Sequence, residues 1–148
     1  MKLWRISNYA DLRGIGGLKT PGRWHNRGIP VVYLSESPAL AMLEVFVHFE
    51  LDLSEVPDTY QLLEVEYTGR KGISRLDTSM LPEAWQSDSD STRSAGDEWL
   101  ASLSSALLKI PSALIPHSYN YLLNPRHELA KNAKIVNAQS HPYDNRLI

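Results

Sequence analysis

The first residue that could carry chemistry is a glutamate in a predicted helix. In the segment that begins at Pro38, Glu44 lies three or four residues from three apolar side chains, which are Leu40, Ala41 and Val47. Its carboxylate therefore projects from a largely apolar helix face, where an unpaired charge is costly. Two interpretations stay open: a structural ion pair with a cation from another element, or a carboxylate that acts as an acid or base or stabilises a cationic transition state.

An arginine follows a glycine in the sequence Gly22-Arg23-Trp24. Because a guanidinium grips phosphate with a bidentate fork, Arg23 at such a bend predicts an anion-binding site. The other interpretation is an arginine stacked on Trp24 at the protein surface. The glycines of this region do not form a G-x-G-x-x-G fingerprint between a strand and a helix, so a Rossmann fold is not expected.

Three further polar side chains are candidates. Tyr33 ends an apolar strand just before the helix of Glu44, so strand, turn and helix could bring both to one cleft; the alternative is a core tyrosine with one hydrogen bond. Ser112 lacks the elbow motif of an activated serine hydrolase. Asn124 belongs to a run rich in Asn and Ser between 111 and 127, whose members either hold a polar ligand or form turns before proline.

Metal and thiol chemistry find no support in the sequence. The chain has no cysteine, which removes disulfides, zinc fingers, iron–sulfur clusters and thiol nucleophiles. Its 5 histidines show no H-x-x-x-H spacing, and the acidic segment 88–90 lacks the glycine and distal glutamate of a calcium loop. We expect neither a metal nor a bound cofactor.

Short strands and two main helices would position these candidates. Strands are predicted at 3–6, 31–34, 59–67, 73–76, 110–115 and 133–138. Helices are predicted from Pro38 to about Glu50, with Ser37 as N-cap, and over 97–108. The glycine-rich stretch 14–22 is expected to be irregular and the Ser/Asp-rich stretch 86–93 to be a loop. Strands grouped in both halves of the chain predict the α+β class.

Length and charge limit the classes of protein to which the chain could belong. The 148 residues predict one domain with a sizeable core. A net charge of −2 and a pI near 6.2 argue against direct DNA binding, which needs clustered Lys and Arg. The charged N-terminus and the absence of a long apolar run predict neither a signal peptide nor a membrane span. We therefore expect a soluble, cytoplasmic protein.

The order of these motifs resembles the RES-domain family, the toxins of bacterial Xre–RES toxin–antitoxin pairs. The three residues that name the family match Arg23, Glu44 and Ser112. The connecting segments 28–33, 37–41 and 120–125 also resemble it, and the likeness runs from residue 3 to residue 138, which leaves 139–148 as a C-terminal tail. The sequence departs from the family at Trp24-His25-Asn26, where Asn directly after Trp is expected, and this affects only local loop contacts.

The resemblance implies a fold similar to the ADP-ribosyltransferase toxins, with small mixed or antiparallel sheets and helices around a cleft for NAD. It implies cleavage of NAD at the nicotinamide–ribose bond, with water or inorganic phosphate as co-substrate. Arg23 would hold the diphosphate, Tyr33 would orient the nicotinamide end and Glu44 would stabilise the cationic ribose. Ser112 would bind substrate or fix Glu44, and Trp24 and Asn124 would complete the NAD-binding set.

The resemblance also implies a partner, an Xre-type antitoxin that covers the active site and supplies the DNA contact in a hetero-oligomer. Two other functions stay open at this point. The same site could transfer ADP-ribose to a protein, or the chain could be a catalytically silent binding module.

Overall fold

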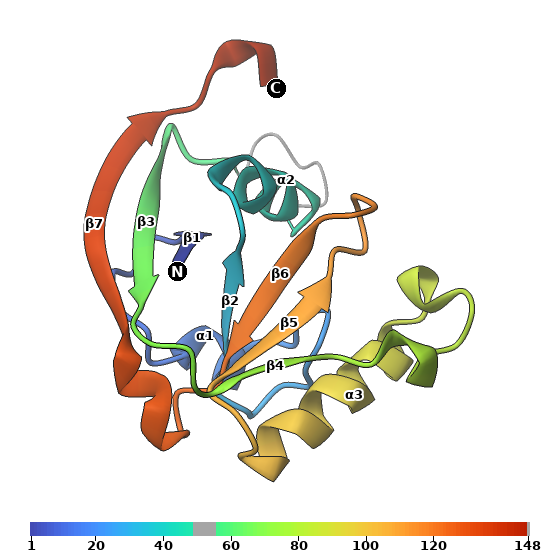
Figure 1. Ribbon diagram of the computed structural model, residues 1–148. Coiled ribbons are helices and arrows are strands. Elements are labelled where there is room, and N and C mark those ends of the chain that lie inside the picture. The colour runs from blue at the N-terminus through green and yellow to red at the C-terminus, as the bar shows by residue number, and fades with distance from the viewer. Residues whose placement is uncertain (49–55, 148) are drawn as a thin grey trace.

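The computed structural model describes residues 1–48 and 56–147, which form one mixed sheet with helices around it (Figure 1). The strands are β1 (Lys2–Ile6), β2 (Val32–Ser35), β3 (Thr59–Tyr67), β4 (Ile73–Arg75), β5 (Leu107–Pro111), β6 (Tyr119–Leu123) and β7 (Ala133–Pro142). The α-helices are α1 (Ile15–Lys19), α2 (Pro38–His48) and α3 (Ser89–Ser102). Short 3-10 turns are η2 (Thr78–Met80), η3 (Trp85–Ser87), η4 (Glu128–Asn132) and η5 (Asn145–Leu147).

The sheet has the strand order β4-β5-β6-β2-β1-β3-β7, and only β4 and β5 are parallel among these pairs. β1 pairs with β3 along its full length but meets β2 at one position, where Trp4 lies opposite Ser35. The long β3–β7 ribbon curves away from the fan of β2, β6, β5 and β4 in Figure 1. The sheet therefore consists of two parts joined at the β1–β2 contact.

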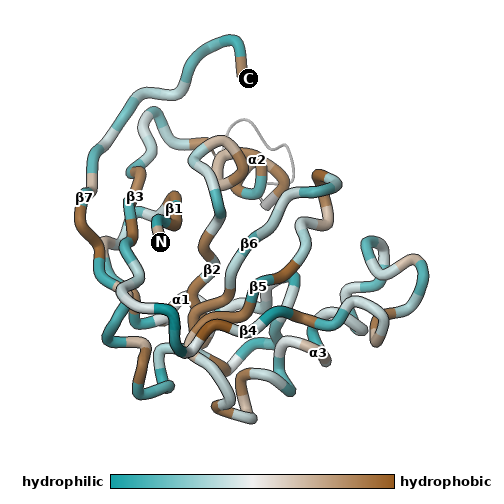
Figure 2. The backbone as a smooth tube through the Cα atoms, viewed as in Figure 1, coloured by the Kyte–Doolittle hydropathy of each residue, from teal (hydrophilic) through white to brown (hydrophobic). Residues whose placement is uncertain are grey.

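A hydrophobic core draws on both parts of the sheet. Leu3 of β1, Val65 of β3 and Leu123 of β6 belong to one buried cluster. In β3, buried Leu63, Val65 and Tyr67 alternate with glutamates, as expected when one face of a strand is buried. Figure 2 shows hydrophobic residues along much of β2 and β5, where adjacent residues on both faces are buried.

A second core lies between the opposite face of β5–β6 and α3. Its buried members are Trp24, Val31, Trp99, Leu100, Leu108, Ile110 and Leu122. Tyr33 and Trp85 pack against this cluster from its edge. This second core positions the segment that carries Arg23 against α3.

The α+β class is confirmed, as are the strands in the first half of the chain and the start of α2. Ser37 Oγ accepts the backbone N–H of Leu40, and Pro38 occupies the first helical position. The predicted end of this helix near Glu50 lies outside the described residues. Within the described part, no helix is long and apolar enough to span a membrane.

Several element predictions in the second half were wrong. The Ser/Asp-rich stretch begins α3 instead of forming a loop, because the Asp88 carboxylate caps the helix by accepting the N–H of Ser91. That helix ends at Ser102, where Leu103 adopts a left-handed φ of 52°, so 107–108 belong to β5. The strand predicted over 110–115 keeps only its first two residues, in β5.

Three further elements were missed or misjudged in length. β6 was not predicted, since the Asn and Ser residues of the run 111–127 were interpreted as ligand-holding or turn-forming. α1 lies inside the glycine-rich stretch that was expected to be irregular. β7 extends to Pro142, across part of the predicted tail, because it pairs with the whole of β3.

Candidate active site

The Glu44 carboxylate is held by two neutral hydrogen-bond donors. Ser112 Oγ and Asn120 Nδ2 both donate to its Oε1 atom, at 2.9 Å and 2.8 Å. Among the described residues, Oε2 accepts no hydrogen bond and no cation lies within 4.0 Å of either oxygen. The ion-pair interpretation of Glu44 thus finds no partner in this part of the chain, and one carboxylate oxygen remains available.

The donors to Glu44 are themselves fixed by neighbouring groups. Ser35 Oγ donates to Asn120 Oδ1 at 2.7 Å, which turns the amide N–H₂ of Asn120 toward Glu44. Ser112 Oγ accepts the backbone N–H groups of Leu114 and Ile115. The oxygens of Ser112 and Asn120 therefore accept hydrogen bonds from other groups, and both residues donate to Glu44. Together the two donors orient a half-buried carboxylate.

Strand pairing brings these side chains together. Ser35 lies opposite Asn120 in the β2–β6 ladder, and Ile110 lies opposite Asn120 in the β5–β6 ladder. Ser112 immediately follows β5, two residues after Ile110, and α2 follows β2 after a short turn. Residues 35, 44, 112 and 120 thus meet where β2, β5 and β6 approach α2.

Arg23 lies beside the start of α3. Its Nη2 donates to the carbonyl of Trp85 at 2.6 Å, and its Nη1 lies 3.5 Å from Ser89 Oγ. Burial lowers the pKa of Arg23, and so does the positive charge of Arg93, whereas Asp88 and Glu44 raise it. Arg23 and Glu44 are therefore close enough for their charges to interact. Arg23 Nε is buried and has no hydrogen-bond partner among the described residues.

Helix α3 holds the backbone that carries Arg23. Thr92 Oγ1 donates to the Arg23 carbonyl at 2.6 Å, and Arg93 Nε donates to the Gly22 carbonyl at 2.8 Å. A side chain at Gly96 would collide with the Trp24 carbonyl, so only glycine allows the loop to approach the helix this closely. Three successive loop residues, 22, 23 and 24, are therefore each held against α3.

Tyr33 reaches the same loop from β2. Its hydroxyl accepts the N–H of Trp24 at 3.0 Å and lies 2.7 Å from His25 Nδ1. His25 Nε2 faces the carbonyls of Gly17 and Thr20, so we assign the proton to Nε2 and let Nδ1 accept from Tyr33. Burial lowers the pKa of His25 and raises that of Tyr33, which keeps both groups neutral near pH 7.

Two of the expected NAD-contacting side chains are placed elsewhere. Trp24 is 2% exposed and packs its ring against Trp85 in the core beneath α3, so it offers no surface for stacking by a ligand or by Arg23. Asn124 is 1% exposed and donates to the Leu100 carbonyl at the far end of β6 from Glu44. In this structure the ring of Trp24 is engaged in packing and the amide of Asn124 in a hydrogen bond at the end of β6.

Asn120 is the functional candidate that sequence reasoning did not select. It was part of the Asn/Ser-rich run, and nothing local distinguished it from Asn124. Recognising 119–123 as a strand would have separated the two, because they then lie at opposite ends of β6.

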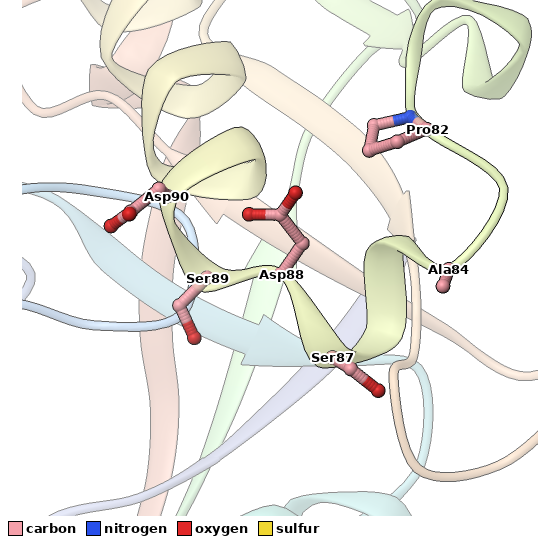
Figure 3. A pocket seen from close by; sticks show the side chains of 6 residues that line it. All are labelled: Pro82, Ala84, Ser87, Asp88, Ser89 and Asp90. Atoms are coloured by element: carbon pink, nitrogen blue, oxygen red, sulfur yellow. The ribbon is translucent and has the colours of Figure 1, made fainter.

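Two hollows adjoin this region. One of about 350 Å³ is lined by Trp85, Ser112 and Tyr119 among others, so it reaches the serine that contacts Glu44. Another of about 500 Å³ lies at the start of α3 and is lined by Pro82, Ala84, Ser87, Asp88, Ser89 and Asp90 (Figure 3). Two aspartates line the second, so the first is the better place for an anionic ligand to meet Glu44.

The arrangement suits a reaction in which positive charge develops on the substrate. A fixed carboxylate with a free oxygen stabilises a cation in a partly buried site, and a nearby arginine binds an anionic group of the same molecule. No cluster of three or more metal-binding side chains occurs in residues 1–48 and 56–147.

The sequence profile of the RES domain matches residues 2–145. A protein of Pseudomonas putida called Toxin Res is 47% identical over 135 residues, which cover 91% of this chain and 92% of that protein. A protein of a Sphingobium species called Prs ADP-ribosylating toxin is 35% identical over 155 residues, covering 98% and 95%.

A solved structure shows a similar fold. A chain of the MbcT–MbcA toxin–antitoxin complex of M. tuberculosis superposes with a TM-score of 0.71 at 13% identity, covering 95% of this chain and 84% of that one.

Proposed function

The chain belongs to the RES domain family, and on this premise we propose that it is a toxin that cleaves NAD between nicotinamide and ribose. The observation that carries the proposal is the Glu44 carboxylate, fixed through one oxygen by Ser112 and Asn120 and within electrostatic reach of Arg23. A cleft with a positioned anion and a positioned cation fits a substrate that combines a diphosphate with a ribose that becomes cationic.

In the proposed reaction, the bond between the ribose and the nicotinamide ring nitrogen breaks, and nicotinamide leaves as a neutral molecule with the bonding electron pair. The ribose then carries the positive charge, which Glu44 Oε2 stabilises more strongly than water would, because the carboxylate needs no reorganisation. An acceptor oxygen attacks the anomeric carbon and loses its proton.

The other residues have supporting parts. Arg23 binds the diphosphate with its guanidinium. Ser112 and Asn120 keep Glu44 in one orientation, and Ser35 keeps Asn120 in its own. Tyr33 contributes its half-buried ring toward the nicotinamide end, while its hydroxyl holds the Arg23 loop.

Water or inorganic phosphate would serve as acceptor, giving ADP-ribose or its phosphorylated form. A second candidate function is transfer of ADP-ribose to a protein, and the observation that favours it is the 35% identical relative whose name is Prs ADP-ribosylating toxin. Both functions use the same Arg23 and Glu44, and they differ only in what reaches the anomeric carbon.

We further propose an Xre-type antitoxin that covers the cleft in a hetero-oligomer and supplies the DNA contact. Support comes from the toxin–antitoxin complex that contains the similar fold, and from the net charge of −2, which gives this chain little attraction for DNA.

The test is release of nicotinamide from NAD by the purified chain, measured with and without phosphate. Product analysis separates hydrolysis from phosphorolysis, and label from adenine-labelled NAD that stays on protein identifies transfer. Unchanged NAD after prolonged incubation of folded protein would instead indicate a silent binding module.

A further inference from the structure

A second arginine lies beside Arg23. Arg93 is on α3, one helical turn after Ser89, the residue whose hydroxyl is near Arg23 Nη1. Its Nε donates to the carbonyl of Gly22, the residue that directly precedes Arg23. This bond fixes the guanidinium against the loop while using only one of its donor positions.

The remaining donors of Arg93 have no protein partner in the described chain. Its Nη1 and Nη2 make no hydrogen bond there, and neither is among the buried polar atoms without a partner, so both reach solvent. Within residues 1–48 and 56–147, no carboxylate forms a salt bridge with Arg93 or with Arg23. Arg93 thus contacts the residue that precedes Arg23, and neither guanidinium has a carboxylate at salt-bridge distance in the described residues.

This pairing has an electrostatic cost. The charge of Arg93 lowers the pKa of Arg23, an effect second only to burial, so the two cations disfavour each other. Arg23 also keeps its Nε atom buried without a partner. Like charges held together by backbone contacts are stabilised when a ligand brings two negative charges between them.

We propose that Arg93 and Arg23 together form a diphosphate-binding site, in which Arg93 is the second arginine that contacts the phosphates of a dinucleotide. The identity of that dinucleotide as NAD rests on the proposed function; the site for a diphosphate rests on the two guanidiniums alone. A role limited to holding the loop through the Nε bond is the alternative.

The first experiment is calorimetric titration with inorganic pyrophosphate, which needs no catalysis. Losing a hydrogen bond to a charged group costs about 1.5–3 kcal/mol, so Arg93→Gln should weaken pyrophosphate binding by roughly 10- to 150-fold. Arg93→Lys should fall between Gln and the unchanged chain, because it keeps the charge but not the fork. Arg70→Gln, at an exposed position, is the matched control and should bind normally.

The second experiment compares NAD with nicotinamide riboside, which has the scissile bond but no phosphate. Arg93→Gln should raise KM for NAD and leave kcat within a few-fold, with no change in use of the riboside. Equal losses with both substrates would overturn the proposal, because the riboside has no phosphate for Arg93 to contact. So would pyrophosphate binding that is absent in the unchanged chain or unaffected by both substitutions.

The two proposals fail in different ways. Pyrophosphate binding that requires Arg93, in a protein that leaves NAD intact, would refute NAD cleavage and keep the diphosphate site. NAD cleavage that is indifferent to Arg93 would refute the second arginine and keep the reaction. If Arg93→Gln does not fold, Arg93→Lys decides by the same titration.

Discussion

Ser112 Oγ donates a hydrogen bond of 2.9 Å to Glu44 Oε1, although 68 positions separate the two residues in the sequence. The contact joins the residue after β5 to the middle of α2. Asn120 donates to the same oxygen, so the opposite oxygen is left to face a substrate. The proposed chemistry depends on this asymmetric hold on one carboxylate.

Removing one of these donors should slow the reaction more than it weakens binding. A typical hydrogen bond contributes about 0.5–1.5 kcal/mol, so Ser112→Ala or Asn120→Ala should lower kcat by roughly 2- to 10-fold with KM for NAD nearly constant. Because both donors act on Oε1, the change in activation free energy in the double variant should differ from the sum of the changes in the two single variants. Ser140→Ala, at an exposed position on β7, is the control. Unchanged kcat in the double variant would refute the orienting role.

The hydroxyl of Tyr33 should matter for the Arg23 loop. Tyr33→Phe leaves the Trp24 N–H without its acceptor in a largely buried site, which costs about 1–3 kcal/mol of unfolding free energy. The loosened loop should also raise KM for NAD, because the position of the Arg23 guanidinium depends on the position of the loop. Calorimetric melting and steady-state kinetics measure the two effects, with the 74% exposed Tyr9 as Tyr9→Phe control. A variant as stable as the unchanged chain would contradict this role.

Close approach of the loop to α3 predicts intolerance at Gly96. Gly96→Ala places a methyl group against the Trp24 carbonyl, and overpacking of this kind costs about 1–3 kcal/mol or more. We expect a lower Tm and weaker NAD use. Gly16→Ala is the matched substitution, since nothing lies within 4 Å of a Cβ there. Equal melting temperatures for the two variants would show that α3 does not clamp the loop.

His25 predicts a dependence of stability on pH. Burial lowers its pKa in the folded chain below the ordinary 6.5, so the unfolded chain binds the proton first as pH falls. The stability from neutral His25 is complete above about pH 6.5 and is lost as pH falls below it. Asp97, which opposes the shift, and Arg93, which adds to it, are the charged groups that act on this ring.

The measurement is the Tm difference between the unchanged chain and His25→Gln between pH 8 and pH 5. Glutamine does not titrate, so the amount by which the Tm of the unchanged chain exceeds that of His25→Gln should shrink toward acid pH. A Tm difference that stays constant or grows toward acid pH would show that folding does not lower the pKa of His25.

The family and the α+β class could be predicted from the sequence because the motifs that indicate them are local. The roles of Arg23, Glu44 and Ser112 stay predictions, which the contact between Ser112 and Glu44 supports. Sequence reasoning missed the start of α3, where Asp88 acts as a helix cap in a stretch whose composition suggests a loop. It selected Asn124 over Asn120, since only the β2–β6 register shows which asparagine lies next to Glu44. The burial of Trp24 is likewise a tertiary effect, produced by packing against α3 and Trp85.

Glu44→Gln is the substitution that separates chemistry from structure. Glutamine keeps an Oε1 that can accept from both Ser112 and Asn120, so the fold should survive with a similar Tm. It removes the charge that stabilises the cationic ribose, a loss on the order of 10²–10³ in kcat for a preorganised electrostatic group.

The most direct test is therefore nicotinamide release from NAD by the unchanged chain and by Glu44→Gln, with Tm recorded on the same preparations. We predict release by the unchanged chain and a loss on the order of 10²–10³ in kcat for the variant, at an unchanged Tm. A Glu44→Gln protein that is destabilised but releases nicotinamide at the full rate would contradict the account.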